Sequence, residues 1–214
     1  MADWVKYFEA SNRTLFNLSI DNRRLIEVII DNTPIKGKIL EAGCGTALLS
    51  LLLSDTGFTV TAMDYTEEVL NYAKSKYCLN PVKIEFVRGD ITRLSSFFEP
   101  YKFDTICHSG VLEHFSDEKI IRSLQEHKKV SRRVIFNVPN NRVKLSANHF
   151  GDERFMNNGK WIKLIRGAGY RSVKVYGGYD LPLITHFFMP GVFFKRRLSF
   201  WWKWMSKHSI FLCE

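Results

Sequence analysis

Cysteine is scarce in this 214-residue chain, and its four copies stand far apart, at Cys44, Cys78, Cys107 and Cys213. No CxxC pair occurs and no histidines lie nearby at zinc-site spacing, which argues against a zinc knuckle or a disulfide framework. The chain also lacks an uncharged apolar run of about 18 residues, and its first residues lack a signal-peptide pattern. We therefore expect reduced cysteines, no membrane-spanning helix and a cytoplasmic location.

Acidic residues are nearly absent from one segment. Residues 160–207 contain ten lysines and arginines but only one acid, Asp180. That segment carries +9, which equals the net charge of the whole chain (31 basic and 22 acidic residues), so the remainder has 21 residues of each sign. An anionic partner is therefore expected to meet the C-terminal part of the protein.

Apolar runs typical of buried strands alternate with helix-forming stretches, a pattern that predicts a parallel, doubly wound, Rossmann-like α/β sheet with helices on both faces. The expected strands are 38–43, 58–64, 82–90, 103–110, 132–140, 170–178 and, ending the chain, 209–214. The expected helices are 18–32, 46–55, 66–77, 116–129 and 157–169. Residues 141–156 lack periodicity and are expected to form a loop over the site.

We divide the single domain, 1–214, into four segments. Residues 1–36 are an N-terminal helical lid, in which Trp4 and Tyr7 either cover the site or are ordinary packing aromatics. Residues 37–178 form the cofactor-binding core, 179–207 an aromatic and basic insertion, and 208–214 the final strand.

The first chemical signal is the motif EAGCGT, Glu41 to Thr46, between the first expected strand and its helix. Glycines let the backbone approach a ligand closely, and the helix N-terminus that follows offers unpaired N–H groups to an anionic group such as a carboxylate. A tight strand-to-helix turn without a ligand is the alternative for this motif alone.

Polar groups follow the next strands at the same edge of the sheet. At the end of the second strand Asp64 is placed to accept ribose hydroxyls, with Tyr65 against an adenine face, although an aspartate here, taken alone, is more often a helix cap. After the third strand, Asp90 is placed to accept the adenine amino group while Ile91 supplies an apolar face. Small residues in HSGVLEHF, from His108, then leave room near a ligand. Ligands in open α/β sheets bind beyond the carboxyl ends of the strands, so four such signals together favour a binding site.

The ordered motifs EAGCGT, MDYT, RGDI and GVLEHF, over about residues 38–178, resemble the class I S-adenosylmethionine-dependent methyltransferases, especially their small-molecule branch. The resemblance implies S-adenosylmethionine as cofactor and a seven-stranded sheet whose last strand is antiparallel. It places the cofactor site at Glu41, Gly43, Cys44, Gly45, Asp64, Tyr65, Asp90, Ile91 and His108.

The sequence has features of two other classes of protein. A nicotinamide dehydrogenase shares the first strand–helix–strand unit, but it favours a third glycine where this chain has Leu48, and it gives Asp90 no role. A non-catalytic binding module at a membrane surface is the second alternative. The intact glycines, Asp64 and Asp90 argue against lost cofactor binding but do not establish turnover.

For catalysis, His114 is the candidate general base toward a hydroxyl acceptor, and a structural histidine is the alternative. Some related quinone-pathway O-methyltransferases carry a metal-binding acid where this chain has Gly110, so no metal is expected at Glu113 and His114. The loop residues His149, Asp152, Glu153 and Arg154 are candidates for acceptor contacts. The strand-four end lacks an NPPY-like element, so a small-molecule or lipid-linked acceptor is favoured over nucleic acid.

The insertion at 179–207 is rich in phenylalanine, tryptophan and basic residues. From about residue 191 its large apolar side chains recur at helical spacing, with the basic residues largely on another face. This pattern predicts either peripheral membrane contact through 187–205 or packing on the core or a dimer partner. The oligomeric state is not predicted.

Overall fold

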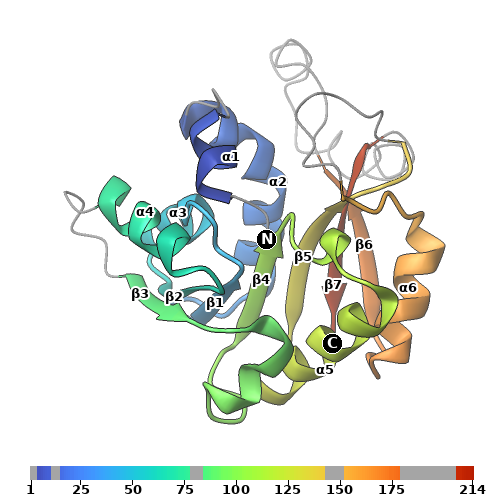
Figure 1. Cartoon of the computed structure of the whole chain (residues 1–214). Coiled ribbons are helices and arrows are strands. Elements are labelled where there is room, and N and C mark those ends of the chain that lie inside the picture. Colours follow the sequence, from blue (N-terminus) through green and yellow to red (C-terminus); the bar gives the residue numbers. More distant parts are fainter. Residues whose placement is uncertain (1–3, 11–14, 78–83, 143–151, 179–205) are drawn as a thin grey trace, which may run out of the picture.

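The computed structural model describes residues 4–10, 15–77, 84–142, 152–178 and 206–214 (Figure 1). Its strands form one seven-stranded sheet in the order β3-β2-β1-β4-β5-β7-β6. Their bounds are β1 Lys38–Ala42, β2 Thr59–Asp64, β3 Ile84–Arg88, β4 Thr105–Ser109, β5 Val134–Pro139, β6 Val173–Gly177 and β7 His208–Cys213. Strands β1 to β5 pair in parallel, and β7 is antiparallel to both β5 and β6, between which it lies. The expected seven strands with an antiparallel last strand are confirmed.

Helices cover both faces of this sheet. The α-helices are α1 Trp4–Ala10, α2 Leu15–Asn32, α3 Leu48–Asp55, α4 Glu67–Tyr77, α5 Asp117–Val130 and α6 Asn158–Gly167, and two 3-10 helices are η1 Ile91–Ser96 and η2 Leu112–His114. Residues of α2 and α3 share one apolar core with the strands, and residues of α5, α6 and η1 share another. None of the described helices is both long and apolar enough to cross a membrane.

Strand β5 illustrates why these runs of sequence become buried strands. Val134, Phe136 and Val138 enter the core beneath α5 and α6, whereas Ile135 between them enters the core beneath α2 and α3. Successive side chains of a strand point to opposite faces, so a strand covered on both faces is apolar at nearly every position.

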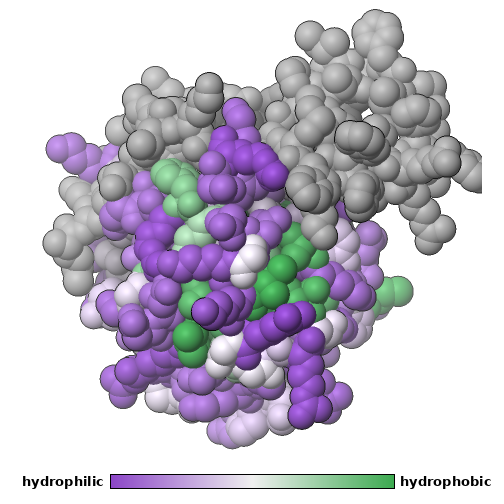
Figure 2. Space-filling view, turned by 90° about the vertical axis from the view of Figure 1, so that its right-hand side faces the viewer, coloured by the Kyte–Doolittle hydropathy of each residue, from purple (hydrophilic) through white to green (hydrophobic). Residues whose placement is uncertain are grey.

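The expected helices lie within a few residues of those observed. Ser116 caps α5 by accepting from Lys119 N at 3.3 Å, and Asn157 caps α6 by accepting from Lys160 N at 2.9 Å. Helix α1 lies within the segment 1–36 that was expected to be helical, although its bounds were not predicted, and η1 and η2 were not predicted. From the side that carries α6, the described surface is mainly hydrophilic around a smaller hydrophobic area (Figure 2).

Two histidines lie inside the core beneath α5. The His108 ring stacks on Phe136 with centroids 5.0 Å apart and lies 5.5 Å from the ring of His127. Both residues are fully buried, and within the described part of the chain neither ring nitrogen of His108 nor Nε2 of His127 has a hydrogen-bond partner. Burial disfavours the charged imidazolium, so it lowers the pKa of His127 to about 4 and that of His108 well below 6.5.

These buried histidines predict a loss of stability in acid. Below pH 6.5 both histidines become protonated in the unfolded chain but stay neutral in the folded core. The free energy of unfolding therefore decreases as pH falls toward the folded-state pKa values. Substituting His108→Phe removes one of these groups and should make the drop between pH 7.5 and pH 5 smaller by about 1 to 2 kcal/mol. Urea unfolding of the wild type and of His108→Phe at the two pH values measures this difference. An equal decrease in the free energy of unfolding of the two proteins would contradict the prediction.

Candidate active site

The glycine turn after β1 has a backbone that only glycine adopts easily. Gly43 and Gly45 have φ values of +80° and +51°, and the N–H groups of Gly43 and Cys44 both donate to the Met63 carbonyl at 2.8 Å. A Cβ on Gly43 would lie 2.8 Å from Cγ2 of Val111, and one on Gly45 would lie 2.8 Å from Cζ of Phe8. Hydrogen bonds therefore hold the turn against β2. Side chains at positions 43 and 45 would collide with Val111 and Phe8, so both positions require glycine.

Glu41 supports this turn from inside the core. Its Oε2 accepts the backbone N–H of Ser50 at 2.8 Å and is 2.5 Å from the Ser50 hydroxyl. Ser50 lies in the first turn of α3, so this carboxyl satisfies a backbone donor that the helix itself leaves open. Burial raises the pKa of Glu41 to about 8. The geometry assigns Glu41 a capping contact, and direct cofactor contact by its side chain stays a prediction.

Asp64, the last residue of β2, joins two turns. One oxygen, Oδ2, accepts from Gly45 N at 3.1 Å, and the other, Oδ1, accepts from Thr66 N at 3.0 Å. Burial raises the pKa of this carboxyl, and the backbone N–H groups act against that shift. A carboxylate oxygen has more than one acceptor site, so these bonds leave capacity for ribose hydroxyls.

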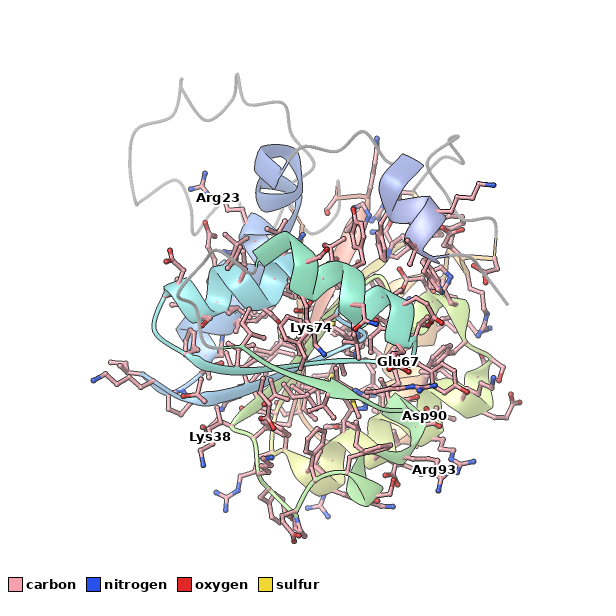
Figure 3. All side chains as sticks on the ribbon, turned by 60° about the vertical axis from the view of Figure 1, so that its left-hand side comes forward. Arg23, Lys38, Glu67, Lys74, Asp90 and Arg93 are labelled. Atoms are coloured by element: carbon pink, nitrogen blue, oxygen red, sulfur yellow. The ribbon has the colours of Figure 1, made fainter. Side chains whose placement is uncertain are left out.

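Asp90 follows β3 at the same edge of the sheet. Glu67 and Asp90 lie toward this edge, and Lys38, at the start of β1, lies toward the opposite one (Figure 3). Oδ1 of Asp90 accepts from both the backbone N–H and the hydroxyl of Thr92, at 2.8 and 2.7 Å, which caps η1. Beside Asp64, the side chain of Tyr65 is 56% exposed and so accessible to a planar ligand.

Three expected site residues have side chains that lie within the protein. Ile91 belongs to the core beneath α5, Cys44 is buried in a small core cluster with residues of α4, and the His108 ring is the one stacked on Phe136. A contact of His108 with the cofactor would therefore come from its main chain. Cys44, Cys107 and Cys213 are free and buried, as expected, and Cys78 lies outside the described residues.

Helix α1 lies over this edge of the sheet. Its Phe8 ring lies against Gly45, and its Trp4 ring meets the His114 ring edge-on with centroids 5.3 Å apart. Trp4 and Phe8 also stack on each other at 6.1 Å. The aromatic spacing of residues 4, 7 and 8 was the available signal for this helix. Helix α2, by contrast, belongs to the layer that packs on the sheet.

His114 ends η2, which begins beside Val111, the residue in contact with Gly43. The ring Nδ1 of His114 is 2.5 Å from Oδ1 of Asp152. Glu113 next to it is buried, its Oε2 has no partner within the described residues, and burial raises its pKa to about 8.

The candidate acceptor loop is described only in part. Arg154 bonds the Phe115 carbonyl and the carboxylate of Asp117, so its side chain is engaged within the protein. His149, the remaining loop candidate, and the segment 179–205 lie outside the described residues. Among the residues that the structure describes, no group of three or more histidines, cysteines and acids is arranged to hold a metal ion.

Comparison with known proteins gives a consistent family. A family model described as a methyltransferase domain matches residues 39–133. The ubiquinone biosynthesis O-methyltransferase of Idiomarina loihiensis is 30% identical over 162 residues, which are 68% of this chain and 66% of that protein. The mitochondrial enzyme of the same name from Schizosaccharomyces pombe is 30% identical over 116 residues, 52% of this chain and 41% of that protein. This chain spans under half the length of several curated relatives that it matches.

Solved structures share the fold at low sequence identity. A SAM-dependent methyltransferase from Archaeoglobus fulgidus superposes with a TM-score of 0.70 at 13% identity, covering 99% of both chains. Magnesium protoporphyrin IX methyltransferase from Synechocystis, solved with bound SAM, has a TM-score of 0.64 at 15% identity, covering 98% of this chain and 88% of that one. The chain belongs to the class I S-adenosylmethionine-dependent methyltransferases, so S-adenosylmethionine is its cofactor. This assignment replaces the dehydrogenase alternative.

The position of Asp64 predicts a binding defect when its carboxylate is removed. Asp64→Ala should weaken binding of S-adenosylhomocysteine by about 1.5 to 3 kcal/mol, because it deletes a charged acceptor and releases the Gly45 turn. Isothermal titration measures the affinity. Glu67→Gln is the matched control, since Glu67 lies at the same edge but pairs on the surface with Arg88. Unchanged affinity in a folded Asp64→Ala variant would contradict a role of Asp64 in cofactor binding.

Proposed function

We propose that this protein transfers the methyl group of S-adenosylmethionine to a hydroxyl of a small-molecule or lipid-linked acceptor, with His114 as general base. The observation that carries the proposal is the placement of His114. A single short helix, α1, contacts both the glycine turn, through Phe8, and the His114 ring, through Trp4. A group with a proton-accepting nitrogen therefore lies at the same strand edge as the cofactor turn.

The glycine turn fits the expected cofactor because Gly43 and Gly45 have positive φ angles and no side chains. The turn can therefore present its backbone to a ligand. When bound, S-adenosylmethionine supplies a methyl group on a positively charged sulfur, which keeps the electron pair of the breaking carbon–sulfur bond. Asp64 would hold the ribose and Asp90 the adenine amino group. Orientation of the acceptor against the methyl group would supply most of the rate increase.

His114 would take the acceptor's proton. A hydroxyl is a poor nucleophile until its proton is removed, and a neutral imidazole accepts a proton near physiological pH. The proton passes from the hydroxyl to Nε2 while the oxygen forms the new bond to carbon. Helix α1 would exclude water from this exchange, in keeping with the lid predicted at the N-terminus.

The acceptor class is inferred from relatives. The ubiquinone biosynthesis O-methyltransferases among the curated relatives are named for methyl transfer to oxygen, which supports a hydroxyl acceptor for this chain. Nucleic acid stays disfavoured by the absence of an NPPY-like element. Membrane contact through 187–205 stays a prediction from sequence, since that segment lies outside the described residues.

Turnover on a hydroxyl acceptor tests the proposal. Formation of S-adenosylhomocysteine is measured with 3,4-dihydroxybenzoate and a panel of quinol and phenol analogues, each beside the matching amine. We expect the hydroxyl compounds to be methylated. His114→Ala should lower turnover about 100-fold or more and leave S-adenosylhomocysteine affinity within about twofold. A fully active His114→Ala variant would make the residue structural, and cofactor binding without turnover on any acceptor would favour the non-catalytic module.

A further inference from the structure

We propose that Asp152 is a positioning residue that fixes the tautomer and orientation of His114, an inference that rests on the proposed role of His114 as base. The two side chains come from elements 38 residues apart in sequence, and His114 Nδ1 lies 2.5 Å from Asp152 Oδ1. A carboxylate only accepts hydrogen bonds, so Nδ1 must carry the hydrogen in this pair. The basic lone pair of the neutral ring is then on Nε2.

The surroundings hold this geometry from several sides. The Trp4 ring packs edge-on against the imidazole, whose side chain is only 11% exposed. Two residues beyond Asp152, the backbone N–H of Arg154 donates to the Glu113 carbonyl at 3.0 Å. The guanidinium of Arg154 bonds the Phe115 carbonyl and Asp117. These contacts fasten the Asp152 loop to both sides of His114.

The chemistry of the pair suits catalysis better than folding. The Asp152 side chain is 57% exposed, and exposed ion pairs contribute little to stability. A carboxylate bonded to Nδ1 nevertheless orients an imidazole and stabilises the imidazolium that forms when Nε2 accepts a proton. Asp152 would therefore act through His114, without touching the acceptor.

The test compares two neutralised acids, Asp152 and Glu118. Asp152→Asn keeps the side-chain size but loses the charge, and its amide can donate to Nδ1, which favours the opposite tautomer. Glu118→Gln removes the charge of an exposed acid in the first turn of α5 and is the matched control. Nitrogen-15 NMR of the imidazoles, with the His114 signal assigned through His114→Gln, reports the tautomer without an acceptor. Steady-state kinetics with 3,4-dihydroxybenzoate, or the best hydroxyl acceptor of the panel, report turnover.

We expect wild-type His114 to carry its hydrogen on Nδ1 and Asp152→Asn to shift it toward Nε2. In that variant kcat should fall about 10- to 100-fold, while the acceptor KM and S-adenosylhomocysteine affinity change by less than about twofold. Asp152→Glu should recover part of kcat, and Glu118→Gln should resemble the wild type.

Different outcomes would overturn the two proposals separately. An unchanged tautomer in Asp152→Asn, or an equal loss of kcat in Glu118→Gln, would overturn the role of Asp152 while leaving His114 as base. Full activity of His114→Gln would overturn the base itself, and the NMR measurement would still show whether Asp152 orients the ring.

Discussion

Met63 and Asp64, the last two residues of β2, hold together the turns of the proposed cofactor site. The Met63 carbonyl accepts the N–H groups of Gly43 and Cys44, and the Asp64 carbonyl accepts that of Gly89 at 2.9 Å. The Asp64 carboxylate also accepts hydrogen bonds from the backbone N–H groups of Gly45 and Thr66. One strand end thus anchors the turns that follow β1, β2 and β3. Any group bound between these turns meets backbone positions fixed relative to one another, which is the condition for recognition at small entropic cost.

Acidic side chains gather at this edge although the whole chain carries +9. Burial, with a smaller contribution from the charge of Asp64, raises the pKa of Glu41, and burial together with the charges of Glu153 and Asp152 raises that of Glu113. A ligand with cationic groups relieves such repulsion, and S-adenosylmethionine carries a sulfonium and an ammonium. The local charge therefore complements the cofactor, while the basic excess belongs to residues 160–207.

The sequence was sufficient for the strands and for the cofactor turn, because apolar runs and glycines are local signals of burial and of positive φ. It could not tell which face each strand residue takes. His108 is an example: its position at the end of a strand predicted a side chain in the site, but the side chain lies in the core. Helix α1 is only seven residues long, so the aromatic spacing of residues 4, 7 and 8 was too short a pattern to give its bounds. The pairing of His114 with Asp152 depends on how a loop returns over η2, and no local pattern encodes that return.

The two halves of the site are built from different interactions, and this difference has consequences for how each half can change. Backbone hydrogen bonds between adjacent strands hold the cofactor half, so altering it disturbs the sheet. Side-chain contacts of α1, η2 and the Asp152 loop hold the proposed acceptor half. In this half exposed side chains such as Asp152 can be substituted at little cost in folding energy, whereas buried Leu112 and Glu113 cannot. Exposed groups of the proposed acceptor half can therefore change without disturbing the backbone turns that follow β1 and β2.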